Sequence, residues 1–187
     1  MEKLKRVLGL RQKDLTLVLA NIHDPHNVSA IYRSCDAFGV PRVHLYYTDT
    51  AFPTLGASSS ASARKWVETT RHKDAQSLMK AMREQGMQVL ATSCSPVAKP
   101  AQEYDFVRPT AIVMGNEHRG VDAELTELVD GEVYIPMYGM IQSFNVSVAA
   151  AILLSEASRQ RRLAGKYDSP TYSDEEYAAL LESWSAK

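Results

Sequence analysis

The residues of this chain that could form a polar binding site lie directly after its apolar runs or just before them. Asn27 and Arg33 follow the first such run, and Glu117 follows a later one. Ser143 and Asn145 lie at the N-terminal end of a long apolar segment. Their amide, guanidinium, carboxylate and hydroxyl groups can hold a polar ligand through hydrogen bonds and charge. A buried helix with a polar opening beside a strand end predicts a ligand site here.

Each of these residues also has an ordinary structural role. Ser143 and Asn145 could serve only as caps of the helix that follows them. Arg33 lies outside the apolar stripe of its predicted helix, where an arginine is usually just solvated. The chain contains no GxGxxG sequence, and no Lys-Ser or Lys-Thr follows the glycines of residues 115–120. Sequence signals for a phosphate-binding loop are therefore missing.

Short apolar runs predict the strands that would position these residues. The runs cover residues 15–22, 42–47, 88–93, 110–114 and 133–135. The first run is continuous, which suits a strand buried on both faces of a parallel sheet. Pro136 should end the last run, because proline has no backbone donor.

Apolar residues at helical spacing predict helices between and beyond these strands. The helices cover residues 1–13, 24–39, 74–85, 146–165 and 173–184. The segment 146–154 is apolar on every side, which predicts a buried helix. The alternation of strands and helices indicates an α/β domain with a mostly parallel sheet. Ligands in such sheets bind beyond the carboxyl ends of the strands, where Asn27, Thr92 and Glu117 would lie.

The length of 187 residues suits one domain with elaborated ends. We expect an N-terminal helical extension over residues 1–14, a body over 15–165 and a C-terminal helical extension over 166–187. The formal net charge of −1 is not typical of an RNA-binding protein. Basic residues nevertheless gather near the N-terminus, around residues 64–73 and around residues 159–166.

The two cysteines, Cys35 and Cys94, are far apart and form no CxxC pair. This usage suits a reducing cytoplasm and argues against a structural zinc site. The charged first thirteen residues do not look like a signal peptide. No apolar run approaches the roughly 20 residues needed to cross a membrane. We therefore expect a cytoplasmic protein with no membrane segment and no metal.

Three segments of the chain resemble the signatures of one family. They read Asn-Val-Ser-Ala-Ile-Tyr-Arg-Ser-Cys-Asp-Ala-Phe-Gly, Gly-Asn-Glu-His-Arg-Gly and Ile-Pro-Met-Tyr-Gly-Met-Ile-Gln-Ser-Phe-Asn-Val-Ser-Val-Ala-Ala-Ala. In this order they resemble the SpoU (TrmH-type) family of RNA ribose 2′-O-methyltransferases. The resemblance implies an α/β sheet whose C-terminal part forms a trefoil knot, as in other SPOUT proteins. It also implies S-adenosylmethionine held in that knot, and a homodimer that completes each active site near its interface.

The resemblance also assigns roles to residues by position. Arg33 would act on the ribose hydroxyl, with Asn27 beside it, and Glu117, Ser143 and Asn145 would complete the polar site. The pocket for the cofactor would be lined by Thr92, Gly115, Ile135, Met137, Met140 and Phe144. The family account makes the arginine a general base, although a guanidinium is almost never deprotonated in proteins. Arg33 would then lose its proton only transiently or stabilise the developing oxyanion.

The terminal extensions resemble the branch of the family that methylates the 2′-hydroxyl of guanosine 18 in the D-loop of tRNA. One alternative is an enzyme with another tRNA or ribosomal RNA target. Another is an RNA-binding relative without activity, against which the joint presence of the five polar residues argues. Contacts with RNA are expected at Arg6, Arg11, Lys65, Arg159, Arg161 and Arg162. The last three also suit a helix C-terminus, where positive charge is favourable.

Overall fold

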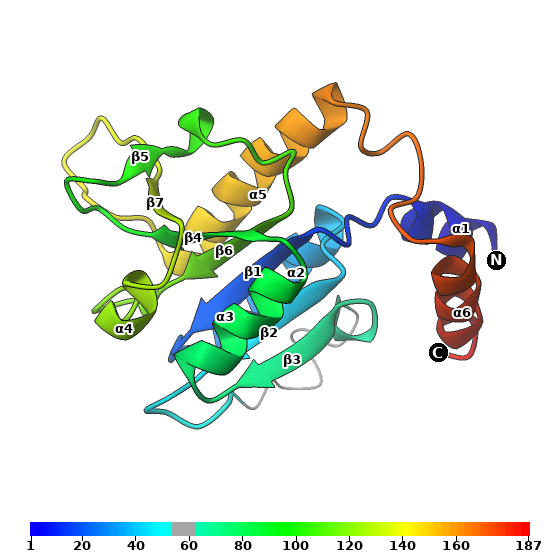
Figure 1. Cartoon of the computed structure of the whole chain (residues 1–187), viewed down its shortest axis with the longest axis horizontal. Helices are drawn as coiled ribbons and strands as arrows, with labels where there is room; N and C mark the ends of the chain where they lie inside the picture. The colour runs from blue at the N-terminus through cyan, green and yellow to red at the C-terminus, as the bar shows by residue number, and fades with distance from the viewer. Residues whose placement is uncertain (54–62) are drawn as a thin grey trace.

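The computed structural model describes residues 1–53 and 63–187. Its strands form one sheet in the order β3-β2-β1-β6-β4-β7-β5, and every neighbouring pair is parallel (Figure 1). The strands are β1 Leu15–Ala20, β2 Arg42–Tyr46, β3 Glu68–His72, β4 Gln88–Thr92, β5 Lys99–Pro100, β6 Thr110–Met114 and β7 Gly131–Tyr134. The prediction of an α/β protein with a mostly parallel sheet is confirmed.

Helices connect these strands and extend beyond them. They are α1 Glu2–Gly9, α2 Pro25–Ala37, α3 Ala75–Glu84, α4 Ala123–Thr126, α5 Val146–Leu163 and α6 Asp174–Ser185, with 3-10 turns η1 Ala63–Lys65 and η2 Ala101–Glu103. The sequence did not predict β3, β5 or α4. The edge strand β3 is mostly solvent-exposed and therefore carries no apolar run. The other two elements span only two and four residues, which is too short for a periodic pattern.

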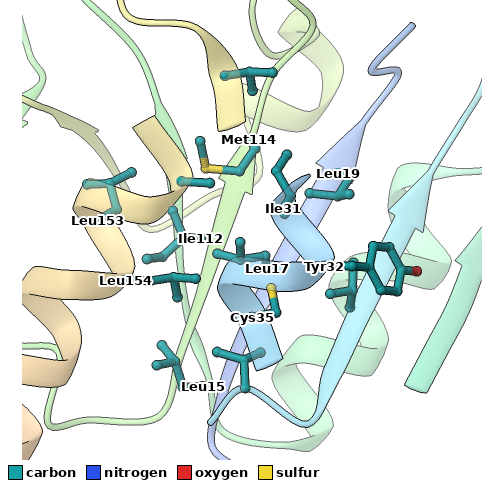
Figure 2. Packing of buried hydrophobic residues seen from close by; sticks show 14 of the residues in the cluster. Leu15, Leu17, Leu19, Ile31, Tyr32, Cys35, Ile112, Met114, Leu153 and Leu154 are labelled. Atoms are coloured by element: carbon teal, nitrogen blue, oxygen red, sulfur yellow. The ribbon is translucent and has the colours of Figure 1, made fainter. Parts of the chain in front are cut away.

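The sheet separates two apolar layers, and the inner strand β1 contributes to both. Leu15, Leu17 and Leu19 face the layer built with α2 and α5, whereas Val18 and Ala20 face the layer built with α3. Successive side chains of a strand point to opposite faces of the sheet, so a continuous apolar run supplies both layers. Figure 2 shows side chains of α2 and α5 meeting those of β1 and β6 in the first layer.

Helix α5 is buried along one side only. Ala150, Leu153, Leu154 and Ala157 pack into the core, but the side chain of Val148 is 46% exposed. The prediction of a buried helix from the apolar segment 146–154 therefore holds for the side that packs on the core and is wrong for the side that carries Val148. In the part of the chain that the structure describes, no helix is long and apolar enough to span a membrane.

The two terminal helices pack on each other at one end of the molecule, where both chain ends lie (Figure 1). A fully buried arginine, Arg11, joins them to the body. Its guanidinium donates to the carboxylate of Asp36 and, at 3.3 Å, to the backbone oxygens of Asp36 and Val40. These acceptors lie at or just beyond the C-terminal end of α2, so Arg11 fixes the N-terminal extension to that helix.

A second fully buried arginine, Arg161 near the end of α5, anchors the start of β1. It donates to the side chains of Gln12 and Asp14 and to the backbone oxygens of Asp14, Phe106 and Arg108. Burial by itself would raise the pKa of Asp14, but hydrogen bonds from Lys166 and Arg161 outweigh burial and hold it below its usual value. Asp14 is therefore a carboxylate at neutral pH, and the buried cation is paired.

These two arginines correct the expected set of RNA contacts. Arg11 and Arg161 have no exposed surface, and their terminal guanidinium nitrogens donate to groups inside the protein, so neither is available to a phosphate. Arg6, Lys65, Arg159 and Arg162 are exposed, and they stay predictions. Arg159 is paired with Glu156 one helical turn away.

Removing the buried guanidinium of Arg161 should destabilise the fold. Arg161→Met leaves the Asp14 carboxylate and three backbone oxygens with fewer donors, and breaking such a buried pair costs about 3–5 kcal/mol. Arg159→Met is the matched control, since its exposed pair should leave the free energy of unfolding nearly unchanged. Urea unfolding measures the free energy of unfolding of both variants. Weakened RNA binding in a fully stable Arg161→Met variant would contradict the structural role.

Candidate active site

A cavity of 540 Å³ lies beyond the carboxyl ends of β4, β6 and β7. Its walls come from the residues that follow these strands and from the segment leading into α5, including Thr92, Gly115, Ile135 and Phe144. The volume falls within the roughly 300–1,000 Å³ typical of small-molecule sites. Its place at the carboxyl edge of a parallel sheet is where open α/β folds bind ligands.

A directed chain of hydrogen bonds joins three distant segments at this cavity. Asn145 Nδ2 donates to Asn27 Oδ1 at 3.0 Å, and Asn27 Nδ2 donates to Glu117 Oε1 at 3.0 Å. Asn27 thus uses one amide group to connect residues that are separated from it by 90 and 118 positions. Glu117, Ser143 and Asn145 line the cavity. Asn27 is not a lining residue, but it is hydrogen-bonded to Glu117 and Asn145.

Local sequence explains how two of these side chains are held. Asp24 caps α2 by accepting from the backbone N–H of His26, and Pro25 occupies the first turn, which places Asn27 near the helix start. Asn145 caps α5 by accepting from the backbone N–H of Ser147 at 2.9 Å. Asn145 is therefore both a cap and a member of the polar chain, and its two functions use different atoms.

Glu117 is held as a carboxylate. Burial would raise its pKa, but hydrogen bonds from Asn27 and from the backbone N–H groups of His23 and Asp24 outweigh burial, so the pKa is lowered. A carboxylate that accepts several hydrogen bonds is a poor proton acceptor at neutral pH. Glu117 therefore suits orientation of neighbouring groups rather than proton abstraction.

The loop after β6 closes tightly on itself. Asn116 and Gly120 exchange two backbone hydrogen bonds of 2.9 Å, and a Cβ atom on Gly115 would lie 2.4 Å from the carbonyl carbon of Gly120. Asn116 Nδ2 also donates to the backbone oxygen of Asn21 at 2.6 Å. Asn21 has a φ of 50°, a left-handed conformation that asparagine adopts more readily than most residues. This pair locks the end of β1 to the end of β6.

Most of the predicted site residues meet at the cavity. The predicted residues that line it are Thr92, Gly115, Glu117, Ile135, Met137, Ser143, Phe144 and Asn145. Met140 does not line it; its side chain is 98% exposed, so its placement in this cavity is wrong for a single chain. Arg33 is exposed on α2 and is not among the lining residues either. Among the described residues, Arg33 forms no hydrogen bond or ion pair.

Several residues of the site were not predicted. Cys94 and His118 also line the cavity, and Asn21 and Asn116 brace its floor. Asn116 lies inside the glycine-bounded segment 115–120, so its neighbourhood was visible in the sequence. Asn21 carried no signal, because its backbone conformation and its partners depend on the tertiary fold.

Comparison with known proteins identifies a family to which this chain is similar. Residues 14–155 match the SpoU rRNA methylase family. The chain belongs to the SpoU methylase family. The three segments that meet through Asn27, Glu117 and Asn145 are the ones that resemble the signatures of SpoU proteins.

Individual SpoU relatives cover nearly the whole chain. A tRNA (guanosine(18)-2′-O)-methyltransferase of Thermus thermophilus is 44% identical over 185 residues, which is 99% of this chain and 95% of that protein. The enzyme of the same name from Escherichia coli is 45% identical over 86% of this chain and 70% of its own length. The crystal structure of the Aquifex aeolicus TrmH/SpoU tRNA modifying enzyme superposes with a TM-score of 0.92 at 38% identity, covering 99% and 94% of the two chains.

A methyl group at residue 115 should distort this SpoU site. Gly115→Ala places a Cβ against backbone atoms of Gly120 and Val121, which cannot move aside as a side chain does. We expect a loss of about 1–3 kcal/mol in the free energy of unfolding, as for other overpacked positions. Gly139→Ala is the control, because a Cβ there meets no atom within 4 Å. Equal stability of the two variants in urea would show that the loop yields freely.

Proposed function

We propose that this protein transfers a methyl group from S-adenosylmethionine to the ribose 2′-hydroxyl of guanosine 18 in the D-loop of tRNA. The observation that carries the proposal is the hydrogen-bonded chain of Asn27, Glu117 and Asn145 at the cavity. Relatives named as tRNA (guanosine(18)-2′-O)-methyltransferases that align over almost the entire chain support the choice of substrate.

The cavity fits the proposed cofactor. Ile135, Met137 and Phe144 give it apolar walls suited to a nucleoside base, and the bare backbone at Gly115 allows close approach. Thr92 Oγ1 donates to the backbone oxygen of Val113 at 2.9 Å and accepts from the N–H of Gly115 at 3.3 Å, which fixes this wall. A SpoU methyltransferase from Streptomyces viridochromogenes, AviRb, has been solved with AdoMet bound; it superposes with a TM-score of 0.71 at 26% identity. When bound, S-adenosylmethionine supplies an electrophilic methyl group, so the reaction requires no metal.

The residues of this chain then have to orient the ribose and ease loss of its proton. An in-line attack needs the 2′-oxygen about 3 Å from the methyl carbon. The lowered pKa of Glu117 makes this carboxylate a weak base for the step. We assign Arg33 to stabilisation of the developing oxyanion, because a guanidinium keeps its proton yet donates strongly. The proton of the 2′-hydroxyl would then pass to solvent water as the methyl group leaves the sulfonium sulfur. Ser143 and Asn145 hold the polar edge of the site.

We further propose that a second copy of the chain completes the site. Arg33 lies outside the lining of the cavity in its own chain, so an arginine presented by a neighbour would supply the missing cation. The side of α5 that carries Val148 forms a shallow surface with Ala30 of α2 and Ile152. Tyr138 and Met140, in the segment before α5, are also almost fully exposed. Exposed apolar surface favours association.

A trefoil knot is part of the same proposal. The chain leaves β7 near one edge of the sheet and then enters α5, which packs on α2. The connecting residues line the cavity together with the loops after β4 and β6, so they run back across the ends of those strands. Such a return across neighbouring strand ends supports the proposal of a knotted path, although folds generally avoid knots.

For contacts with tRNA we propose the exposed cations Arg6, Lys65, Arg159 and Arg162. Each phosphate contact adds to the salt dependence of binding. We also propose that the protein works in the cytoplasm, where its proposed substrate would be modified and where an exposed free thiol such as Cys94 stays reduced.

The position of the transferred methyl group tests the reaction. The protein is incubated with labelled S-adenosylmethionine and unmodified tRNA transcripts, and the label is mapped by nuclease digestion. We expect label on the ribose of guanosine 18 and none on a transcript in which that nucleotide is 2′-deoxyguanosine. Label at another tRNA or ribosomal RNA nucleotide would favour the related-target alternative. Calorimetry without any S-adenosylmethionine binding would favour a non-catalytic RNA-binding protein.

Substitution of Arg33 tests its role. Arg33→Ala should lower the methyl-transfer rate by about 10²–10³, the effect of losing one donor to a developing oxyanion, while cofactor affinity measured by calorimetry stays unchanged. A pH–rate profile of Arg33→Lys separates the two mechanisms. A true base requires the rate-limiting ionisation to move with the substitution, whereas electrostatic stabilisation leaves it in place. Full turnover by Arg33→Ala would discard the assignment.

A further inference from the structure

A cluster of aromatic and basic side chains joins the C-terminal helix to a turn beside α2. Trp184 of α6 is only 6% exposed, although it lies close to the C-terminus. Its ring lies 5.0 Å from the ring of Trp66, and the Arg11 guanidinium lies 5.3 Å from the Trp184 ring. The last residue, Lys187, places its ammonium 5.7 Å from the Trp66 ring. We call these four side chains the C-terminal latch.

The latch acts on the turn η1. Lys187 Nζ donates to the backbone oxygen of Lys65, and Trp66 directly follows the turn. On its other side the turn is buried in the core, where Ala63 and Val67 pack in the same cluster as α2 side chains. The turn is therefore held between the core next to α2 and the C-terminal helix.

The Lys65 side chain points out from this fixed backbone. It is exposed, and among the described residues its ammonium has no hydrogen-bonded or ion-paired partner. The turn contacts α2, the helix that also carries Arg33. A cation on a rigid backbone loses less freedom on binding a phosphate than one on a free loop.

Arg11 connects the latch to the same helix. Its guanidinium donates to Asp36 at the C-terminal end of α2 while it lies against the Trp184 ring. A cation over an indole ring is attracted by the electron density of that face. Trp184 therefore packs between a side chain fixed to α2 and the ring that follows Lys65.

From these contacts we propose that Trp184 is a positioning residue for the tRNA substrate. It holds the turn η1 against the body, so that Lys65 contacts a phosphate of the tRNA from a fixed place beside the helix that carries Arg33. The inference rests on the proposed function, because it takes tRNA as the ligand. Trp184 itself touches neither the cofactor nor the reacting ribose.

Binding of an unmodified tRNA transcript over a range of salt concentrations tests the inference. Trp184→Ala and Lys65→Gln should each weaken binding by about fivefold and lower the slope of log affinity against log salt by about 0.7–0.9, the loss of one phosphate contact. The double variant should bind no more weakly than either single variant, because both changes remove the same contact. The affinity of Trp184→Ala for S-adenosylmethionine, measured by calorimetry, should stay within about twofold of wild type.

Two control variants separate positioning from general stability. Trp184→Phe keeps an aromatic face and should restore tRNA affinity to within about twofold. Tyr177→Phe removes the hydrogen bond from the Tyr177 hydroxyl to the Lys5 backbone oxygen, a contact between α6 and α1 outside the latch, and should leave tRNA affinity unchanged.

Additive losses in the double variant, or an equal loss in Tyr177→Phe, would overturn the inference. If Trp184→Ala does not fold, an unchanged salt slope in Lys65→Gln is sufficient to overturn the inference. If the variants show this pattern of tRNA binding but the wild-type protein methylates no guanosine 18, the proposed reaction is wrong and the inference about Trp184 is supported. If the wild-type protein methylates guanosine 18 but the variants do not show the pattern, the inference is wrong and the proposed reaction is supported.

Discussion

The site depends on the two hydrogen bonds made by the side-chain amide of Asn27. Its oxygen accepts from Asn145 and its nitrogen donates to Glu117, so one side chain connects the starts of α2 and α5 with the loop after β6. An amide suits this position because it is donor and acceptor at once. Aspartate could accept from Asn145 but would face the Glu117 carboxylate without a proton to donate. The orientation of Asn145 at the start of α5 and part of the support for the charge of Glu117 follow from this one group.

Two buried arginines hold distant segments together near the ends of the chain, as Asn27 does at the site. Arg11 and Arg161 are fully buried, and each joins segments far apart in sequence through side-chain and backbone acceptors. Burying a guanidinium is costly unless its donors are satisfied, and these contacts supply carboxylates and carbonyl oxygens for that purpose. The two extensions are thereby fixed to the ends of α2, α5 and β1 rather than lying loosely on the surface.

The sequence predicted the parallel sheet and the meeting of the three polar segments, since apolar periodicity and the motifs are local in the chain. It did not predict the edge strand β3, whose Glu-Thr-Thr-Arg-His run has no apolar pattern because one edge of the sheet faces solvent. It also assigned Arg11 and Arg161 to RNA, because charge is visible in a sequence while burial and partners are not. The left-handed backbone at Asn21 and the exposure of Met140 depend in the same way on tertiary contacts.

The order in which the site residues occur has a consequence for protein synthesis. Asn27 leaves the ribosome early, but its partner Asn145 is 118 residues further along the chain. Contacts of such long sequence separation are slow to form, because much of the chain must be ordered before they contribute. A nascent chain released before α5 would have a nearly complete sheet and no working pocket. Premature termination anywhere before that helix should therefore yield no partially active fragment.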